Sequence, residues 1–200
     1  MTAPGARFEL ILAHRYGTGA ALDFSGYENN GRVEGHPRRA PGPGPETSAL
    51  GFDGIDDRVV VPPSASLRHL AGLRIDTSLH LDELAGRRTI VEGSSSFALL
   101  VEPDGVVEGT IYNGSRWEGV RSARDAMPLG RWVRLTFVYD GLDTSALYLD
   151  STLLALDHRP LGPVDPVAWP FGLNVGGWPE RDVRMFRGSI EEVKIWRRAT

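Results

Sequence analysis

Residues 131–139 read Arg-Trp-Val-Arg-Leu-Thr-Phe-Val-Tyr, and this stretch decides the class of fold. Every second residue from Val133 to Tyr139 is apolar, whereas the residues between them, from Trp132 to Val138, are mixed. Successive side chains of a β-strand point to opposite faces of a sheet. The alternation therefore predicts a strand with one face in a hydrophobic core and the other face partly in water.

Short strands joined by tight turns are predicted around this stretch. Residues 146–149 and 152–156 are apolar runs that flank Asp150-Ser151, which predicts a hairpin. A two-residue turn of this kind needs positive φ angles, so Ser151 predicts either a longer loop or some strain. The 24 glycines and 14 prolines fall between such runs. This punctuation is typical of an all-β sandwich or barrel.

The Pro- and Gly-rich segment 39–46 has two interpretations, a linker between domains or a surface loop within one domain. We expect a surface loop, because neither side of the segment alone looks able to close a sandwich. The length of 200 residues also suits one large all-β domain better than two small ones.

The composition excludes several classes of protein. The chain has no cysteine, which excludes disulfides, thiolate metal sites and thiol catalysis. The formal net charge is −4 with both signs spread along the chain, so no basic stripe points to nucleic acid or to an anionic membrane. No apolar run approaches the ~18 residues that would span a bilayer. No Sec signal peptide is visible after Met1, which leaves the cytoplasm or export as part of a larger assembly.

Motifs near both ends of the chain bracket the central strand. Residues 23–31 read DFSGYENNG, residues 49–57 read ALGFDGIDD and residues 186–196 read FRGSIEEVKIW. In this order and spacing, together with residues 129–141 and 147–150, they resemble the laminin-G-like jelly rolls of the concanavalin A-like lectin/glucanase superfamily. The resemblance implies an antiparallel two-sheet β-sandwich of the jelly-roll type, formed as a single domain by residues 1–200. It also implies roughly six or seven strands in each sheet, with the two ends of the chain together.

Oxygen ligands of the kind that calcium binds occur in the first motif and in the last strand. Asp23 and Asn30 lie in a glycine-containing loop, and Glu191 precedes Val193 by two residues, which predicts that its carboxylate faces inward with Val193. An inward carboxylate needs a partner, because an unpaired buried charge is costly. The resemblance implies a structural calcium held by Asp23, Asn30 and Glu191, although relatives commonly have Asp at the last position. The alternative is an Asx-rich turn, with Glu191 paired to an arginine.

Other acidic residues give no sign of catalysis. Asp53, Asp56 and Asp57 look like metal ligands, but the resemblance implies a turn between strands that uses the backbone freedom of Gly54. A glycosidase needs two carboxyl groups roughly 5–9.5 Å apart, and the alternating Glu-x-Asp-x-Glu of the glucanases in this superfamily does not occur. The sequence also lacks a nucleophile elbow and a metal-spaced histidine pair. We therefore expect no catalytic residue and no enzymatic activity.

Tryptophans in turn-like segments are the candidates for ligand binding. Trp178 and Arg181 lie in a segment without a strand pattern, and Trp117 follows Tyr112 in another. Sugar sites combine aromatic faces with a few polar groups. We therefore predict a ligand site formed by Trp178, Trp117, Tyr112 and Arg181. The alternative is that the tryptophans cap the edge of the core, as we expect for Trp132.

Two functions of different classes fit these features. The first is a non-enzymatic recognition module that binds a carbohydrate or a glycosylated surface, braced by a structural calcium. The second is a decoration or fibre subunit of a virion or phage-tail-like assembly, engaged through protein–protein contacts. If the protein is a free lectin, we expect a monomer with an aromatic groove. If it is a subunit of such an assembly, we expect a flat apolar face and self-association. The expected partner is a glycan, a cell surface or a protein, and we expect neither nucleic-acid binding nor membrane insertion.

Overall fold

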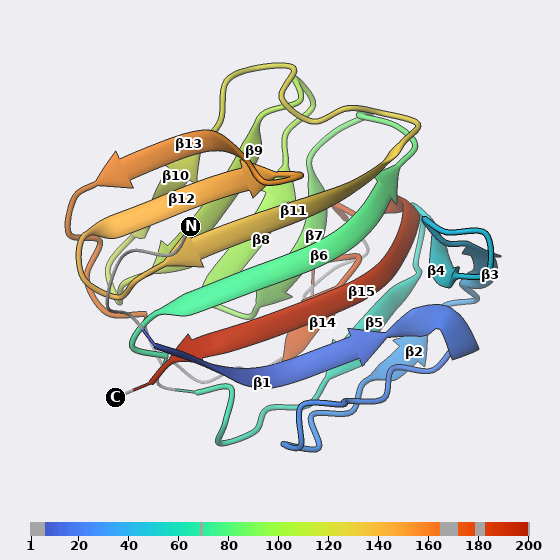
Figure 1. The fold of residues 1–200 in the computed structure, drawn as a ribbon, viewed down its shortest axis with the longest axis horizontal. Helices are drawn as coiled ribbons and strands as arrows, with labels where there is room; N and C mark the ends of the chain where they lie inside the picture. Colours follow the sequence, from blue (N-terminus) through green and yellow to red (C-terminus); the bar gives the residue numbers. More distant parts are fainter. Residues whose placement is uncertain (1–6, 69, 165–171, 179–182, 200) are drawn as a thin grey trace.

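Two antiparallel sheets packed face to face make up the fold (Figure 1). A computed structural model of the chain describes residues 7–68, 70–164, 172–178 and 183–199. Sheet A, turned toward the viewer in Figure 1, has eight strands in the order β13-β12-β11-β6-β15-β4-β3, with β1 paired to β15. Its strands are β1 (Phe8–Arg15), β3 (Arg38–Pro41), β4 (Ser48–Asp53), β6 (Leu73–Leu81), β11 (Trp132–Tyr139), β12 (Thr144–Leu149), β13 (Thr152–His158) and β15 (Arg187–Arg198).

Sheet B lies behind sheet A and has seven strands, in the order β10-β9-β8-β7-β14-β5-β2. Its strands are β2 (Arg32–Glu34), β5 (Arg58–Val61), β7 (Arg88–Gly93), β8 (Phe97–Val101), β9 (Val107–Tyr112), β10 (Trp117–Arg121) and β14 (Leu173–Val175). The antiparallel two-sheet sandwich expected from the sequence is confirmed. Within the described ranges, helix is confined to the 3-10 turn Tyr16–Thr18, and no helix there is long and apolar enough to cross a bilayer.

The hydrophobic core lies between the sheets and is built by alternate residues of each strand. On β11, the inward residues Leu135, Phe137 and Tyr139 are fully buried, whereas Arg134 on the other face is exposed, as the alternation predicts. From sheet B, Gly109 meets the ring of Phe137, and a Cβ atom at this glycine would lie 2.2 Å from that ring. The missing side chain therefore makes room for the phenylalanine. The division of residues 1–200 into a single domain stays a prediction.

The two ends of the described chain lie side by side, as expected. β1 pairs with β15 along almost its whole length, from Phe8 opposite Arg198 to Arg15 opposite Glu192. Figure 1 shows the two strands next to each other at the lower edge of sheet A. The β15 strand also pairs with β4 and β6, so the last strand of the chain holds together three strands from its first half.

Two expectations about turns have different outcomes. Asp150 and Ser151 form a two-residue turn between β12 and β13 with φ angles of 49° and 77°, so strain is present and the longer loop is not. The segment 39–46, expected to be a surface loop, is partly strand: residues 39–41 belong to β3 and pair with β4. The correction follows from the turn at residues 42–47, where the Gly42 amide donates to the Thr47 carbonyl at 2.9 Å and closes a hairpin.

Candidate functional site

A cleft opens on the outer face of sheet B, the face turned away from sheet A. Its floor crosses β7, β8 and β9, where Glu92, Ala98 and Thr110 lie opposite one another, and the row continues to Gly119 on β10. Ala98 and Thr110 have small side chains and Gly119 has none, so the floor is low. The cleft encloses about 330 Å³, which lies near the lower end of the roughly 300–1,000 Å³ typical of ligand pockets.

Two tryptophans from distant parts of the chain stand at the cleft. Trp117, at the start of β10, is 45% exposed, and its ring centre lies 5.5 Å from that of Tyr112 on β9. Trp178 follows β14 and is half-buried, with the guanidinium carbon of Arg184 4.5 Å from its ring centre. Both indole rings line the same cleft. Aromatic faces placed in this way suit a ligand with a flat apolar side and a polar rim.

The segment that carries Trp178 and Arg184 is fastened to β7. The Gly176 amide donates to the Ile90 carbonyl at 3.0 Å, and the Thr89 amide donates to the Arg184 carbonyl at 2.8 Å. Arg184 has a φ of 58°, in the left-handed region that residues with a side chain seldom occupy. Such backbone strain persists where the surroundings fix it, and it is concentrated at functional sites.

The charged groups of the cleft are held by neighbours. Arg87 forms an ion pair with Glu102, and this hydrogen bond raises the pKa of Arg87. Glu108 accepts a hydrogen bond from Arg121 at 3.1 Å. Glu92 is 4% exposed at the floor. Fixed carboxylates can accept hydrogen bonds from the hydroxyl groups of a ligand, and fixed guanidinium groups can donate to its oxygens.

The structure brings together two of the predicted ligand residues, Trp117 and Trp178, and places Tyr112 against the first of them. Arg181 lies outside the described residues. Whether these residues bind a ligand stays a prediction. Sequence reasoning missed Glu92 and Arg184, which also line the cleft. The period-two pattern of the strands assigns Glu92 to an outward face, but no sequence signal pairs Arg184 with Trp178.

Asp23 organises the loop that follows β1. Its carboxylate accepts hydrogen bonds from the amides of Ala13 at 2.8 Å and of Ser25 and Asn29 at 2.9 Å, and from the Ser25 hydroxyl at 2.7 Å. The Asn30 side-chain oxygen accepts from the Asp23 amide at 2.8 Å. Burial opposes ionisation, but the hydrogen bonds outweigh it and hold the pKa of Asp23 below its ordinary value. These contacts match the Asx-type turn named as the alternative, and calcium at this loop stays a prediction.

Glu191 does not share the inward face of Val193, which corrects the prediction. The pairing of β15 with β6 shifts between Ile190 and Glu192, so a β-bulge resets the alternation of side chains. Glu191 is half-buried and lines a hollow on sheet A with Arg134, whose side chain is on the outer face. β1 pairs with β15 along one edge, and along its other edge the Ala13 amide donates a hydrogen bond to the Asp23 carboxylate. An entire strand thus lies between Asp23 and the strand of Glu191.

Asp53, Asp56 and Asp57 lie in the turn between β4 and β5, as the sequence led us to expect. Their carboxylate oxygens lie within 4.8 Å of one another. Asp57 is 2% exposed and accepts hydrogen bonds from the amides of His36 at 2.7 Å and Asp53 at 3.0 Å. Burial, reinforced by the two neighbouring carboxylates, raises the pKa of Asp57. The turn is therefore held by Asp57, and Gly54 supplies its left-handed residue with a φ of 80°.

Comparison with known proteins gives a family and a fold. A family model described as the concanavalin A-like lectin/glucanases superfamily matches residues 53–200. Among curated protein sequences, none matches the chain. Domain 4 of AbnA, an extracellular GH43 arabinanase from Geobacillus stearothermophilus solved in complex with arabinotriose, has a TM-score of 0.73 and 17% identity, covering 96% of this chain and 94% of that one.

Two toxin domains are also similar in structure. The binding domain of Paraclostridial Mosquitocidal Protein 1 has a TM-score of 0.77 and 12% identity, covering 96% of this chain and 49% of that one. The receptor-binding domain of botulinum neurotoxin D has a TM-score of 0.72 and 14% identity, covering 96% of this chain and 50% of that one. The chain thus spans about half of each toxin domain. At these identities the likeness shows the fold alone.

Proposed function

The chain belongs to the concanavalin A-like lectin/glucanases superfamily, and we propose that it is a non-enzymatic recognition module that binds a carbohydrate in the cleft of sheet B. One observation carries the proposal. Trp117 and Trp178, which are far apart in the sequence, line one cleft together with charged groups that neighbouring residues hold in place.

The chemistry of this lining supports a sugar as ligand. A sugar ring has an apolar face of C–H groups that packs against an indole ring, and hydroxyl groups at its edge that need hydrogen-bond partners. Trp117 and Trp178 supply the rings, while Glu108 and Arg87 supply an acceptor and donors. The likeness to the arabinanase domain, which was solved with arabinotriose, supports the same class of ligand.

A glycan array followed by calorimetric titration of the retained glycans tests this proposal. We expect Trp117→Ala and Trp178→Ala each to weaken binding by about tenfold or more, because loss of a central aromatic contact costs more than about 1 kcal/mol. Trp132→Ala is the matched control, since Trp132 lies on sheet A, packed 5.8 Å from the ring of His80. The control should bind as the unchanged chain does.

Two results would contradict the proposal. One is a folded chain that retains no glycan on the array. The other is equal binding by Trp117→Ala, Trp178→Ala and Trp132→Ala when thermal unfolding shows that all three variants are folded.

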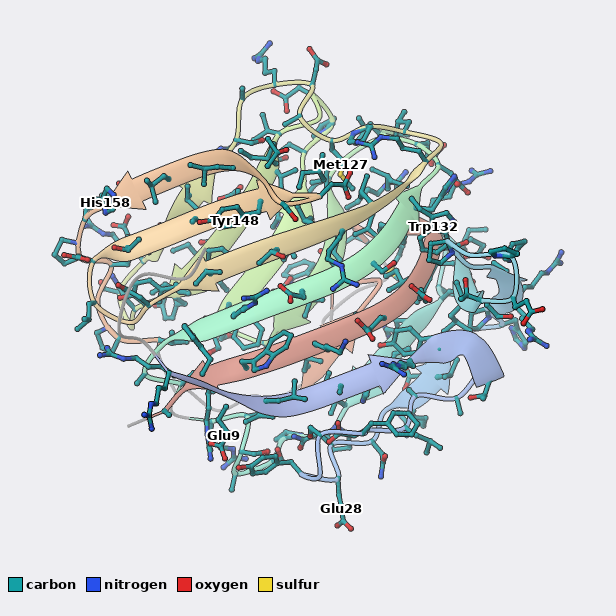
Figure 2. All side chains as sticks on the ribbon, viewed as in Figure 1. Glu9, Glu28, Met127, Trp132, Tyr148 and His158 are labelled. Carbon is teal, nitrogen blue, oxygen red and sulfur yellow. The ribbon has the colours of Figure 1, made fainter. Side chains whose placement is uncertain are left out.

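A second candidate function is a structural subunit that associates with a further copy of the chain through the outer face of sheet A. Side chains on this face form a row across six strands, because the residues lie opposite one another from β1 to β13. The row is Leu10, Trp196, Arg74, Val138, Ala146 and Leu156. Leu156 in this row and Leu153 beside it are each 47% exposed, and Figure 2 shows Tyr148 on the same face of β12.

The edge position of β13 favours a second copy as the partner. Among the described residues β13 ends sheet A, and an edge strand of this kind can pair with a strand of another chain. Light scattering over a range of concentrations tests this function. A defined oligomer that Leu153→Lys with Leu156→Lys converts to monomer would support it. A monomer at every concentration would contradict it.

The structural calcium remains a separate proposal, supported by the oxygen-rich loop that Asp23 and Asn30 share. Thermal unfolding with added calcium and with EDTA tests it, because a ligand that binds only the folded state raises the unfolding midpoint. A rise with calcium that Asp23→Asn abolishes would support the site. An unchanged midpoint would assign Asp23 to hydrogen bonding alone.

A further inference from the structure

The cleft of sheet B is closed at one end. Along the row of the floor, the residue after Glu92 is Asn174 on β14, which is 1% exposed and lies beyond the lining of the cleft. Trp178 and Arg184 line the cleft, and two hydrogen bonds hold their segment beside Ile90 and Thr89 of β7. Trp178 and Arg184 therefore bound the cleft at its β7 end.

The opposite end of the cleft leads to the edge of the sheet. β10 is the last strand of sheet B, and its Trp117 lines the cleft. The row of the floor continues to Gly119, which has no side chain of its own and whose carbonyl accepts a hydrogen bond from the Arg159 side chain at 3.1 Å. A Cβ atom at Gly119 would lie 2.1 Å from the carbonyl oxygen of Gly109, so the strand packing itself keeps this position free of a side chain. Trp117 stands at this end on the same strand and is exposed.

From these two ends we infer that the cleft binds the terminus of a glycan chain. The terminal sugar lies at the closed end near Trp178 and Arg184, and the following sugars pass Trp117 and leave over β10. This inference rests on the function proposed above. Neighbouring strands lie about 4.8 Å apart, so the cleft spans about 14 Å from β7, which carries Glu92, to β10, which carries Trp117. That length exceeds one sugar ring and accommodates the terminal sugar with its neighbour.

The polar groups at the closed end give a reason for selectivity. A terminal sugar carries a hydroxyl group that a linkage blocks in the interior of the chain. Glu92 and Arg184 offer an acceptor and donors at the closed end. A site that hydrogen-bonds a hydroxyl group discriminates strongly against a ligand that lacks it. An interior stretch of glycan would also have to continue past Trp178 and Arg184, which bound this end.

Competition by intact and partly hydrolysed polysaccharide at equal mass tests this inference. The probes are soluble arabinan, xylan, galactan and glucan, together with their mono- to tetrasaccharides. Hydrolysis that raises the number of chain ends tenfold should lower the mass of competitor needed for half-inhibition by about tenfold. Unchanged or weaker competition after hydrolysis would overturn terminal binding.

Two variants locate the terminal sugar. Trp178→Ala should weaken the monosaccharide and the trisaccharide by about tenfold or more. Trp117→Ala should weaken the trisaccharide but leave the monosaccharide unchanged within about twofold. A monosaccharide that does not bind, or that loses as much affinity in Trp117→Ala as in Trp178→Ala, would overturn the assignment.

The failure of this inference can be told apart from failure of the proposed function. Absence of binding to every glycan would overturn both. Binding that does not depend on chain ends would overturn the inference and leave carbohydrate recognition in place.

Discussion

Replacing Ser151 with glycine should stabilise the protein, and the size of the effect follows from the turn between β12 and β13. Ser151 has a φ of 77°, in the left-handed region. That conformation costs an L-residue about 1–2 kcal/mol, and glycine adopts it without that cost. Glycine also gives the unfolded chain more freedom, which offsets about 0.5–1 kcal/mol. The net gain in the free energy of unfolding is about 0.5–1 kcal/mol.

Thermal and urea-induced unfolding of Ser151→Gly measure this gain. For a chain of this length, about 1 kcal/mol corresponds to a rise of about 2–4 °C in the midpoint. Ser151→Ala is the matched control, because it also removes the hydroxyl group but keeps the Cβ atom. If Ser151→Ala stabilises the protein as much as Ser151→Gly, or if Ser151→Gly lowers the midpoint, the reasoning from backbone strain is wrong.

Three further changes test other parts of the structure. Gly109→Ala should cost about 1–3 kcal/mol through overpacking against Phe137, whereas Gly44→Ala, whose Cβ would meet no atom closer than 3.4 Å, should be nearly neutral in the same unfolding assay. Burial lowers the pKa of His14 below 6.5 despite its hydrogen bond to the Asn29 carbonyl. As the pH falls, the unfolded chain therefore protonates His14 before the folded chain does, so the contribution of His14 to the free energy of unfolding is complete above about pH 6.5 and is lost as the pH falls further. His14→Gln should reduce this pH dependence in urea titrations at several pH values. An unchanged slope of the free energy of unfolding against pH would contradict this role of His14. Asp23→Ala should destabilise the protein by about 2–4 kcal/mol, because it leaves three partly buried amides without their acceptor. A loss below about 1 kcal/mol by urea unfolding would contradict the role of Asp23 in holding the loop.

Features that depend on neighbours in the sequence were predictable. The alternation from Val133 to Tyr139 is a local pattern, and it assigns both faces of β11 correctly. The Asp150-Ser151 turn was also predictable, because two apolar runs fix its position. The sequence gives no warning of the bulge near Glu191, because a bulge is set by how β15 must bend to pair with β1, β4 and β6.

The cleft could be predicted only in part. Trp117 and Trp178 stand out as tryptophans in turns, but their meeting depends on the order of strands in sheet B, which places β10 and β14 on either side of β7–β9. The charged lining is harder to predict, since Glu92 and Arg87 resemble the many other charged residues of the chain. Their roles follow from register, which is a property of the whole sheet.

The position of β15 has a consequence for how the protein is made. During synthesis β1, β4 and β6 leave the ribosome long before β15, yet each of them pairs with β15 in the finished sheet. Sheet A therefore cannot be completed until residues 187–198 have emerged, because β15 joins β1 and the β3–β4 pair to β6, and closing such distant pairings is slow. Until then the nascent chain exposes apolar strand faces, which makes it a client for chaperones. A ribosome stalled before residue 187 should thus display a chain that proteases cut readily, whereas one stalled well beyond β15 should display a resistant sandwich.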